Sequence, residues 1–436
     1  MSKRTQNTID WTFSRKHLMI MNWWAPSSPV RNSFGILLDG SIRSGKTLPG
    51  SCSYTLWSFY AFPNGGQRFF FAGKTIGTVR RNVVDPLYDA APYLGLSIVD
   101  HRTDNMIEIC DANNRKHEFH LFGGNDERSQ SLIRGFTGAG GFFDEATEMP
   151  ESFVNMALSR LSVEGATAWF TTNPDNPNHW FKKDFIDRAL EKNLIYLHLT
   201  MRDNLSLSEA VLARYESLYS GVFYRRFIKG EWCAAEGVVY PEFISRDDLV
   251  FDFNGDWSQY GEMAVSCDYG TQNAHVYLLF AWHIERKRWE AVKEWYQDGR
   301  GTGNQMSDNE KYDALLSFVG NLPVRDVIID PSAASFAAMI RKAKRFRPVG
   351  ADNDVSNGIA YTASLFHINK LAVCLDCKML IAEIGGYRWD SKQVDKGKDV
   401  PVKEHDHSVD ALRYFAFTHI RRYEKRYGIL ISREAA

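Results

Sequence analysis

The sequence predicts an α/β protein with two domains in tandem. In the first half of the chain, short apolar segments alternate with helical patterns, which is typical of helices layered on a mostly parallel sheet. A new series of strands begins after residues 232–240, and 436 residues suit two or three domains of ordinary size. We expect the first domain to span residues 1–231, with a helical lid or linker at 180–231, and the second to span 236–436.

The composition is that of a globular protein, with 44% apolar and 24% charged residues. The 52 basic and 53 acidic residues almost cancel, so the chain is not a polycation that coats nucleic acid, and DNA contacts must come from local patches. No apolar run approaches the ~18 residues of a membrane span, and the N-terminus lacks the apolar core of a secretory signal. Six cysteines do not make a disulfide framework.

The pattern of the first half predicts its elements in order. A buried strand runs into a glycine-rich turn and a helix, and two alternating segments around a polar turn predict a hairpin. The predicted strands are 34–38, 67–71, 140–143 and 168–172, the hairpin strands are 105–110 and 117–122, and the helical segments are 75–91 and 206–231.

The second half is predicted to begin with an antiparallel meander. Its strands are 263–267, 276–282 and 288–296, the last two joined by a charged turn. A further buried strand, 324–329, ends at Asp330. Helical stretches and short strands then alternate up to a basic C-terminal helix.

The turn after the first strand satisfies the phosphate-binding pattern G-x-x-x-x-G-K-[ST] at every fixed position. It reads Gly40-Ser41-Ile42-Arg43-Ser44-Gly45-Lys46-Thr47. In such a loop the backbone N–H groups surround the phosphates, Lys46 neutralises the β- and γ-phosphates, and the Thr47 hydroxyl binds Mg²⁺. Pro49 is tolerated because it falls in the first turn of the following helix. The sequence therefore predicts a nucleotide site here.

A carboxylate pair follows a short apolar strand further along the chain. Gly140-Gly141-Phe142-Phe143 leads into Asp144 and Glu145. In a nucleotide site, Asp144 would join the Mg²⁺ shell and Glu145 would polarise the attacking water. An isolated Asp-Glu pair is usually only a helix N-terminus, so it is the phosphate-binding loop upstream that favours the catalytic interpretation.

Residues 168–174 form another predicted strand that ends in polar residues, among them Asn173. Such a residue beside the Asp144 strand could hydrogen-bond the γ-phosphate or its attacking water. From the residues alone, a strand-to-loop turn made by Asn173-Pro174 is the favoured explanation.

Acidic residues in the second half predict a metal site. Asp268 and Asp330 each close an apolar strand, while Asp406 and Asp410 share one face of a predicted helix, with His407 beside them. Converging carboxylates could hold two divalent cations roughly 3.5–4 Å apart, as in phosphodiester hydrolysis. Carboxylates so close would repel each other without a metal. Acidic strand ends are also common turn formers, so the pattern alone does not favour a nuclease.

The order of these motifs resembles that of the large terminase subunit of tailed bacteriophages, over roughly residues 30–415. Lys229-Gly230-Glu231-Trp232, followed by Glu236-Gly237-Val238-Val239-Tyr240, looks like the family's junction between motor and nuclease. The segment 406–414 is similar to the family's D-H-x-x-D-A-x-R-Y signature, which is the most specific single match. Two positions depart from the family: Ser266 stands where relatives often carry Gly, and the Asp144 strand has glycines where bulky residues are usual.

The resemblance implies a P-loop ASCE-type ATPase domain followed by an RNase H-like nuclease domain. It implies that Asp268, Asp330 and Asp410 are the nuclease metal ligands, with His407 as a further member of the site and Asp406 in support. It also implies that Asn173 couples hydrolysis to movement.

The resemblance also implies roles for two arginines. Arg43, inside the phosphate-binding loop, resembles the family's phosphate-sensing arginine. Arg134 matches the position from which some relatives send an arginine finger into a neighbouring subunit of a ring. Arg128 is the competing candidate, and an ordinary surface arginine is the simplest alternative.

By this resemblance the chain is expected to drive double-stranded DNA into the procapsid with ATP and Mg²⁺, and to cut concatemeric DNA with Mg²⁺ or Mn²⁺, using two ions. The implied partners are double-stranded DNA, a small terminase subunit, the portal protein and further copies of the chain in a ring, with no membrane. The implied location is the host cytoplasm, transiently on the procapsid, and not the virion. The alternatives are an ATP-dependent helicase-nuclease of DNA repair or restriction, although no second set of nucleotide motifs follows residue 240, and a non-enzymatic ATP-gated assembly factor.

Three other features carry less weight. The basic segments 341–347 and 421–426 are either solvated surface or contacts with phosphate, and the second could also dock on the portal. His179-Trp180-Phe181 is expected in the core rather than stacked on bases. Cys374 and Cys377 form a single C-x-x-C with no second pair, so a zinc site is not expected.

Overall fold

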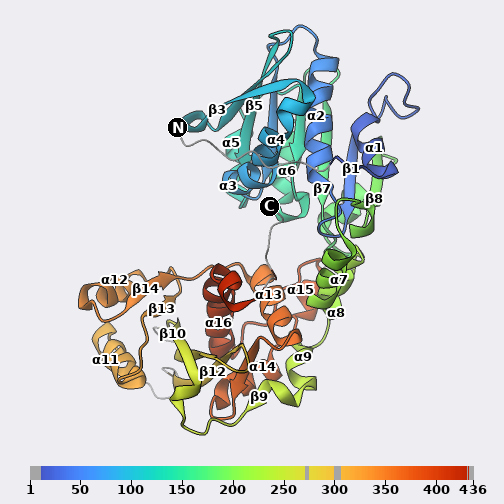
Figure 1. Ribbon diagram of the computed structural model, residues 1–436. Coiled ribbons are helices and arrows are strands. Elements are labelled where there is room, and N and C mark those ends of the chain that lie inside the picture. Colours follow the sequence, from blue (N-terminus) through green and yellow to red (C-terminus); the bar gives the residue numbers. More distant parts are fainter. Residues whose placement is uncertain (1–10, 271–273, 299–305, 430, 432–436) are drawn as a thin grey trace.

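Two separate sheets organise the chain into two lobes, one above the other in Figure 1. The computed structural model describes residues 11–270, 274–298, 306–429 and 431. The first lobe, drawn in blue to green, contains an eight-stranded sheet, and the second, drawn in yellow to red, contains a seven-stranded sheet. The short helices α7 (Glu209–Leu218) and α8 (Gly221–Phe223) lie where the lobes join.

The first sheet has the strand order β3-β4-β5-β2-β6-β7-β1-β8. Its strands from β5 to β8 are parallel, while β3, β4 and β5 form an antiparallel meander at one side. The bounds are β1 Gly35–Gly40, β2 Arg68–Gly73, β3 Leu96–His101, β4 Met106–Asp111, β5 Lys116–Gly123, β6 Gly140–Phe143, β7 Thr167–Thr172 and β8 Leu194–Leu199. The strand β7 separates β1 from β6, as in ASCE-type P-loop ATPases, and all three end at the same edge.

Helices cover this sheet where the sequence predicts them. The helix α2 begins at Thr47, so Pro49 falls in its first turn, as expected. The predicted helix 75–91 is a continuous helical stretch with one π-helical turn, Arg80–Val84, between α3 and α4. The helix bounds are α1 Arg15–Asn22, α2 Thr47–Ala61, α3 Ile76–Val79, α4 Asp85–Ala90, α5 Gln130–Ile133 and α6 Glu151–Leu158.

The prediction of a helical segment across 180–231 holds for the π-helical turn Lys182–Ile186 but is wrong for residues 194–199. Residues Leu194–Leu199 form β8, which pairs with β1 along its whole length and closes the edge of the first sheet. Only two of its six residues are buried, because an edge strand is covered on one side, and this weakens the apolar signal. Helix α7 starts at Glu209, and the helical part follows from there.

The second sheet has the strand order β14-β13-β10-β11-β12-β15-β9. The predicted meander is confirmed, since β10, β11 and β12 are antiparallel neighbours, and parallel strands flank it. The strand bounds are β9 Val250–Phe251, β10 Tyr260–Asp268, β11 His275–His283, β12 Arg288–Gln297, β13 Asp326–Ile329, β14 Arg347–Gly350 and β15 Leu371–Cys374.

The second lobe carries helices on its sheet, with α16 packed against β10 and β11. The helix bounds are α9 Pro241–Ser245, α11 Asp308–Val319, α12 Ala334–Ala343, α13 Val355–His367, α14 Lys378–Gly386, α15 Ser391–Asp395 and α16 His407–Tyr414. The chain then continues in a π-helical turn, Phe415–Ile420. None of the helices among the described residues combines the length and the apolar character needed to cross a membrane.

Aromatic side chains dominate the core of the first lobe. Tyr54 of α2 packs against rings from four strands, including Phe71, Phe119 and Trp169, with ring centroids 4.9–5.7 Å apart. Phe181 is fully buried in the same lobe and stacks on Phe185, which agrees with its predicted core position, whereas His179 and Trp180 are half-buried. The core of the second lobe extends back to Met201 through the helical segment. The boundary at 231–236 remains a prediction.

Candidate functional site

The phosphate-binding loop begins at Gly40, where the backbone conformation and the close approach of β8 leave no space for a side chain. Gly40 has a φ of +139°, and a Cβ there would lie 1.7 Å from the carbonyl oxygen of Leu199. The next residue, Ser41, donates its backbone N–H to the same oxygen at 3.0 Å. The edge strand β8 therefore fixes the direction in which the loop starts.

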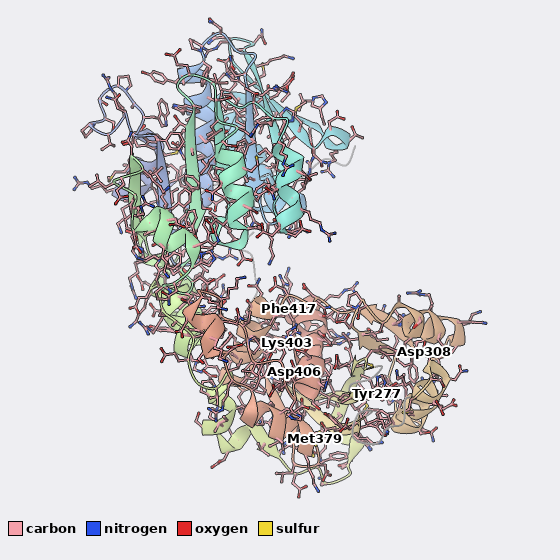
Figure 2. All side chains as sticks on the ribbon, turned by 180° about the vertical axis from the view of Figure 1, so that it is seen from behind. Tyr277, Asp308, Met379, Lys403, Asp406 and Phe417 are labelled. Atoms are coloured by element: carbon pink, nitrogen blue, oxygen red, sulfur yellow. The ribbon has the colours of Figure 1, made fainter. Side chains whose placement is uncertain are left out.

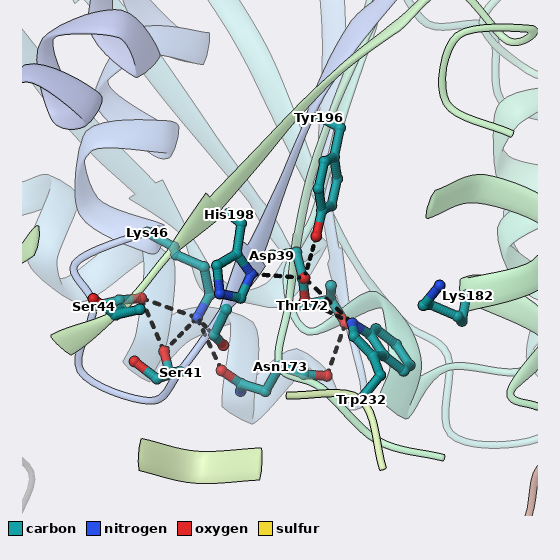
Figure 3. A network of polar contacts seen from close by, with 12 residues as sticks. Asp39, Ser41, Ser44, Lys46, Thr172, Asn173, Lys182, Tyr196, His198 and Trp232 are labelled. Atoms are coloured by element: carbon teal, nitrogen blue, oxygen red, sulfur yellow. Dashed lines mark hydrogen bonds and ion pairs between the residues drawn. The ribbon is translucent and has the colours of Figure 1, made fainter. Parts of the chain in front are cut away.

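Lys46 is the centre of the loop (Figure 3). Its ammonium donates to the carbonyls of Gly40 and Ser41 at 2.9 and 2.7 Å, and to Ser44 Oγ at 3.2 Å. It also donates to Asn173 Oδ1 at 2.9 Å, so the residue predicted to couple hydrolysis to movement touches the loop lysine. Burial lowers the pKa of Lys46 to about 8, although neighbouring carboxylates raise it.

Asp144 lies beside Thr47 at the end of β6. Its Oδ1 accepts from the hydroxyls of Thr47 at 3.3 Å and Thr171 at 2.9 Å, and its Oδ2 accepts from Asn82 Nδ2 at 3.3 Å. Burial raises the pKa of this carboxyl. A hydroxyl and a buried carboxylate held side by side are the oxygen donors that Mg²⁺ takes in a phosphate-binding site, so the residues fit that ion.

Glu145 is held in a strained backbone conformation. It is not glycine, yet its φ is +52°, and its backbone N–H donates to Thr171 Oγ1 at 3.0 Å, which helps fix this conformation. Burial, with the charges of Asp144 and Glu148, raises the pKa of Glu145 to about 8. Its side chain and Asn173 line a cavity of about 790 Å³ at the junction of the lobes. Strain and a raised pKa both mark it as a functional residue.

Asp39, which the sequence analysis missed, forms a polar cluster immediately before the loop. The buried carboxylate accepts from Tyr196 Oη at 2.8 Å and from Trp232 Nε1 at 3.2 Å, and it lies 3.1 Å from His198 Nδ1 (Figure 3). Its position at the end of an apolar strand, directly before Gly40, was the available signal. Trp232 belongs to the predicted junction, which therefore contacts the base of the loop.

The two candidate arginines lie in different settings. Arg43 has a φ of +58° within the loop, and its guanidinium lies 5.9 Å from the centre of the Tyr215 ring. Arg134 follows α5 and is exposed, and so is Arg128. Exposure suits a residue that reaches into a neighbouring subunit, but it does not distinguish Arg134 from Arg128.

The predicted acidic residues lie in the second lobe, near the helix α16, where Figure 2 labels Asp406. Asp268 Oδ2 lies 2.8 Å from His407 Nδ1, which joins the end of β10 to the start of α16. Burial and the nearby charge of Asp410 raise the pKa of Asp268 to about 6, and the contact with Asp268 raises the pKa of His407.

Asp330 and Asp410 have partners of their own. Asp330 accepts from Tyr414 Oη at 2.9 Å and from Asn353 Nδ2 at 2.7 Å, and such hydrogen bonds lower its pKa although burial raises it. Asp410 pairs with Arg413 at 2.9 Å, one turn along the helix. The hydroxyl of Tyr414 thus lies among the acidic side chains, and burial together with the charges of Asp410, Asp268 and Asp330 raises its pKa.

Within the described ranges, no three His, Cys, Asp or Glu side chains are placed so that together they could hold a metal ion. The donors are nevertheless carboxylate oxygens, which suit Mg²⁺ and Mn²⁺. Burial together with a like charge also makes Asp268 a carboxylate that a cation would stabilise. The acidic residues therefore fit a metal chemically, although Tyr414, His407 and Arg413 now occupy their oxygens.

Known proteins that resemble this chain show the family to which it belongs. The family described as terminase large subunit, T4-like virus type, N-terminal, matches residues 37–247. A crystal structure of the large terminase from a thermophilic bacteriophage is 44% identical, and the match covers 94% of this chain and 99% of that one with a TM-score of 0.88. The chain belongs to the large terminase family.

Two further structures of the large terminase from the same thermophilic phage match equally well. Its complex with ADP is 44% identical with a TM-score of 0.88, and its complex with ATP-γ-S is 43% identical with a TM-score of 0.87. Both matches cover 94% of this chain and all of that one. No curated protein matches.

Membership in this family defines the activity of the chain. It is a phage genome-packaging motor subunit that carries a P-loop ATPase fold and an RNase H-like nuclease fold. It is both an ATPase and a nuclease. Nothing in the comparisons supports the helicase-nuclease alternative.

Proposed function

We propose that the large terminase hydrolyses ATP at the Gly40–Thr47 loop and cuts DNA at the acidic residues around Tyr414. The observation that carries the proposal is the meeting of four predicted residues at one sheet edge: Lys46 contacts Asn173, and Thr47 contacts Asp144. Lys46 and Thr47 follow β1, Asp144 follows β6 and Asn173 follows β7, and these three strands are parallel. The relative from the thermophilic phage is known with ADP and with ATP-γ-S bound.

In the proposed ATPase site each residue has one task. Lys46 binds the β- and γ-phosphates, with the loop residues Gly40, Ser41, Arg43, Ser44 and Gly45 around them. Thr47 and Asp144 hold Mg²⁺, which supplies charge neutralisation when bound. Glu145 accepts the proton of the attacking water, and its raised pKa suits a general base near neutral pH. Asn173 reports the state of the γ-phosphate because it already contacts Lys46.

In the proposed nuclease site Asp268, Asp330 and Asp410 would hold Mg²⁺ or Mn²⁺, in one or two ions. Bound cations supply charge stabilisation and an activated water in phosphodiester hydrolysis. His407 orients Asp268 through the 2.8 Å contact, and Asp406 caps the start of α16, where its backbone carbonyl accepts from the N–H of Asp410 at 2.8 Å. Tyr414 holds Asp330 in place until a cation binds.

The proposal also includes partners. Double-stranded DNA would contact the exposed basic residues of 341–347 by their charge, with affinity that falls steeply with salt. Ion pairs engage residues of both basic segments: Arg426 pairs with Glu262 at 2.7 Å in 421–426, and Arg347 pairs with Asp326 at 2.5 Å in 341–347. We propose a ring of subunits on the portal, in which Arg134 completes a neighbouring ATPase site, assisted by a small terminase subunit in the host cytoplasm.

Two variants test the proposal on the same preparations. Lys46→Ala should lose ATPase activity and still cut plasmid DNA with Mn²⁺, whereas Asp268→Ala should keep the ATPase and lose cleavage. Lys116→Ala, at an exposed lysine of the first lobe, is the control. The nucleotide assignment fails if Lys46→Ala hydrolyses ATP normally. The nuclease assignment fails if wild type leaves plasmid intact in Mg²⁺ and Mn²⁺, or if Asp268→Ala cuts as well as wild type.

A further inference from the structure

A buried arginine, Arg226, joins the two lobes behind the proposed nucleotide site. It lies in the π-helical turn Tyr224–Ile228 and is only 6% exposed. Its guanidinium pairs with Asp175 of the first lobe at 2.8 Å and with Asp399 of the second lobe. It also donates to the carbonyl of Cys233 in the junction, through Nε at 3.0 Å. The side chains of Arg226 and Asp399 are both buried, so the loss of Asp399 would be strongly destabilising, whereas the side chain of Asp175 is 39% exposed and can be lost at lower cost.

The first-lobe partner lies next to the nucleotide site. Asp175 is two residues after Asn173, whose side chain accepts from Lys46 at 2.9 Å. Pro174 between them fixes its own φ and restricts Asn173, so this short segment is stiff. The carbonyl of Asp175 further accepts from the backbone N–H of Cys233 at 3.1 Å. A displacement of Asn173 therefore has a direct mechanical path to Arg226.

The second-lobe partner lies in a loop that is seated closely on the first lobe. Asn176 donates to Asp399 Oδ1 at 2.7 Å and to the carbonyl of Val394 at 3.0 Å, and Asn176 is fully buried. Gly397 has a φ of +82°, and a Cβ there would lie 2.3 Å from the carbonyl oxygen of Asn178. The loop 394–400, which begins at the end of α15, therefore leaves no room at Gly397 for a side chain against Asn178. It also precedes the acidic segment 406–410 by a few residues.

We propose that Arg226 is a positioning residue that transmits changes at the Lys46–Asn173 contact to the loop 394–400 of the second lobe. It lines the same cavity as Glu145 and Asn173. It acts through Asp175 on one side and Asp399 on the other. The proposal rests on the proposed function, since it requires nucleotide to bind at Lys46.

Hydrogen–deuterium exchange on the full chain, with and without ATP-γ-S, tests the proposal. In wild type, ATP-γ-S should slow exchange in the phosphate-binding loop and change exchange in the peptides that cover 394–400. In Arg226→Gln and Asp399→Asn, ATP-γ-S should still protect the phosphate-binding loop from exchange. The change in exchange at 394–400 should be at least fivefold smaller than in wild type. Arg225→Gln, at the neighbouring exposed arginine that pairs with Glu231, is the matched control and should behave as wild type.

Two results would overturn the proposal: no change at 394–400 in wild type although the phosphate-binding loop is protected, or a change that persists in both variants. A failure of ATP-γ-S to protect the loop in wild type would instead contradict the proposed nucleotide site. If Arg226→Gln does not fold, Asp399→Asn carries the test, because its amide oxygen can still accept from Asn176.

Discussion

The two candidate sites of this large terminase are built in opposite ways. In the first lobe, protein groups already hold the charged residues in working positions: Lys46 has four acceptors, and Asp144 has three donors. In the second lobe, the acidic side chains are each held by a different partner, and no three described ligating side chains form a metal set.

This difference follows from the charges that each site contains. In the first site the ammonium of Lys46 attracts the carboxylates Asp39, Glu145 and Asp144, and direct hydrogen bonds hold it in the loop. The second site gathers carboxylates of like charge, and His407, Arg413 and Tyr414 keep them in place one by one. The protein groups of the nucleotide site are therefore preorganised, whereas we propose that cations complete the nuclease site.

The largest expected effect concerns the preorganised site. Glu145→Gln keeps the shape of the side chain but cannot accept a proton, so the ATPase kcat should fall by roughly 10²–10⁴-fold. The affinity for ATP-γ-S, measured by calorimetry, should change little, because Lys46 and Thr47 bind the phosphates. A kcat within a factor of three of wild type would remove Glu145 as the base.

The second prediction separates ligands from supporting residues at the nuclease site. Asp410→Asn should slow plasmid cleavage with Mn²⁺ by about 10²–10³-fold, because a proposed metal ligand is lost. Asp406→Asn, at the cap of the same helix, should slow it by less than about tenfold. Equal losses in the two variants would show that the helix start, and not a ligand position, determines the rate.

The third prediction uses a buried carboxyl that supports the helix carrying the acidic site. Glu383 accepts from the backbone N–H groups of Ser408 and Val409 at 2.6 and 3.1 Å, and burial raises its pKa from 4.5 to about 7. The folded state thus binds the proton more tightly than the unfolded state, so this stability is present below pH 4.5 and is lost as the pH rises to 7.

Since Glu383→Gln cannot ionise, it should gain stability relative to wild type between pH 5 and pH 8, by at most about 3 kcal/mol. Denaturant unfolding at both pH values measures the difference, and Glu404→Gln at an exposed position is the control. If the difference in unfolding free energy between Glu383→Gln and wild type stays constant from pH 5 to pH 8, the raised pKa of Glu383 is contradicted.

The smallest expected effect concerns a more exposed contact between the lobes. Lys74 pairs with Glu148 of the first lobe at 2.9 Å and with Asp354 of the second at 2.8 Å, and its side chain is 36% exposed. Because solvent screens such a pair, Lys74→Met should cost about 1 kcal/mol or less in denaturant unfolding. Lys116→Met removes an exposed ion pair within the first lobe and provides the comparison. A cost above about 3 kcal/mol for Lys74→Met would mean that its ion pairs contribute as much as buried ones.

Sequence reasoning was most successful where one site is made by contiguous residues. The loop 40–47 could be predicted because its eight residues supply both the turn and the lysine. The glycines of the Asp144 strand, which depart from the family, are explained by packing against the neighbouring strand β2: a Cβ at Gly141 would lie 2.3 Å from the ring of Phe70. In the first sheet the two strands that were not predicted, β3 and β8, lie at the edges, and their half-exposed faces weaken the apolar pattern.

Contacts between distant residues could not be predicted in this way. The partners of Asp39 lie 157–193 positions away, and Tyr414 meets Asp330 across 84 positions. No local pattern specifies such pairs, because the packing of whole elements determines them. The family resemblance favoured a role for Asn173, and the matched signature 406–414 ends at Tyr414, but no pattern identified Arg226.

The central claim is that cations complete the nuclease site, and diffraction from crystals of the full chain grown with Mn²⁺ tests it most directly. The account predicts anomalous peaks bonded to carboxylate oxygens of Asp268 and Asp410, with Asp330 released from Tyr414 or sharing a cation. Anomalous peaks only elsewhere, or carboxylates that stay on His407, Tyr414 and Arg413 in crystals of protein that cuts DNA with Mn²⁺, would contradict it.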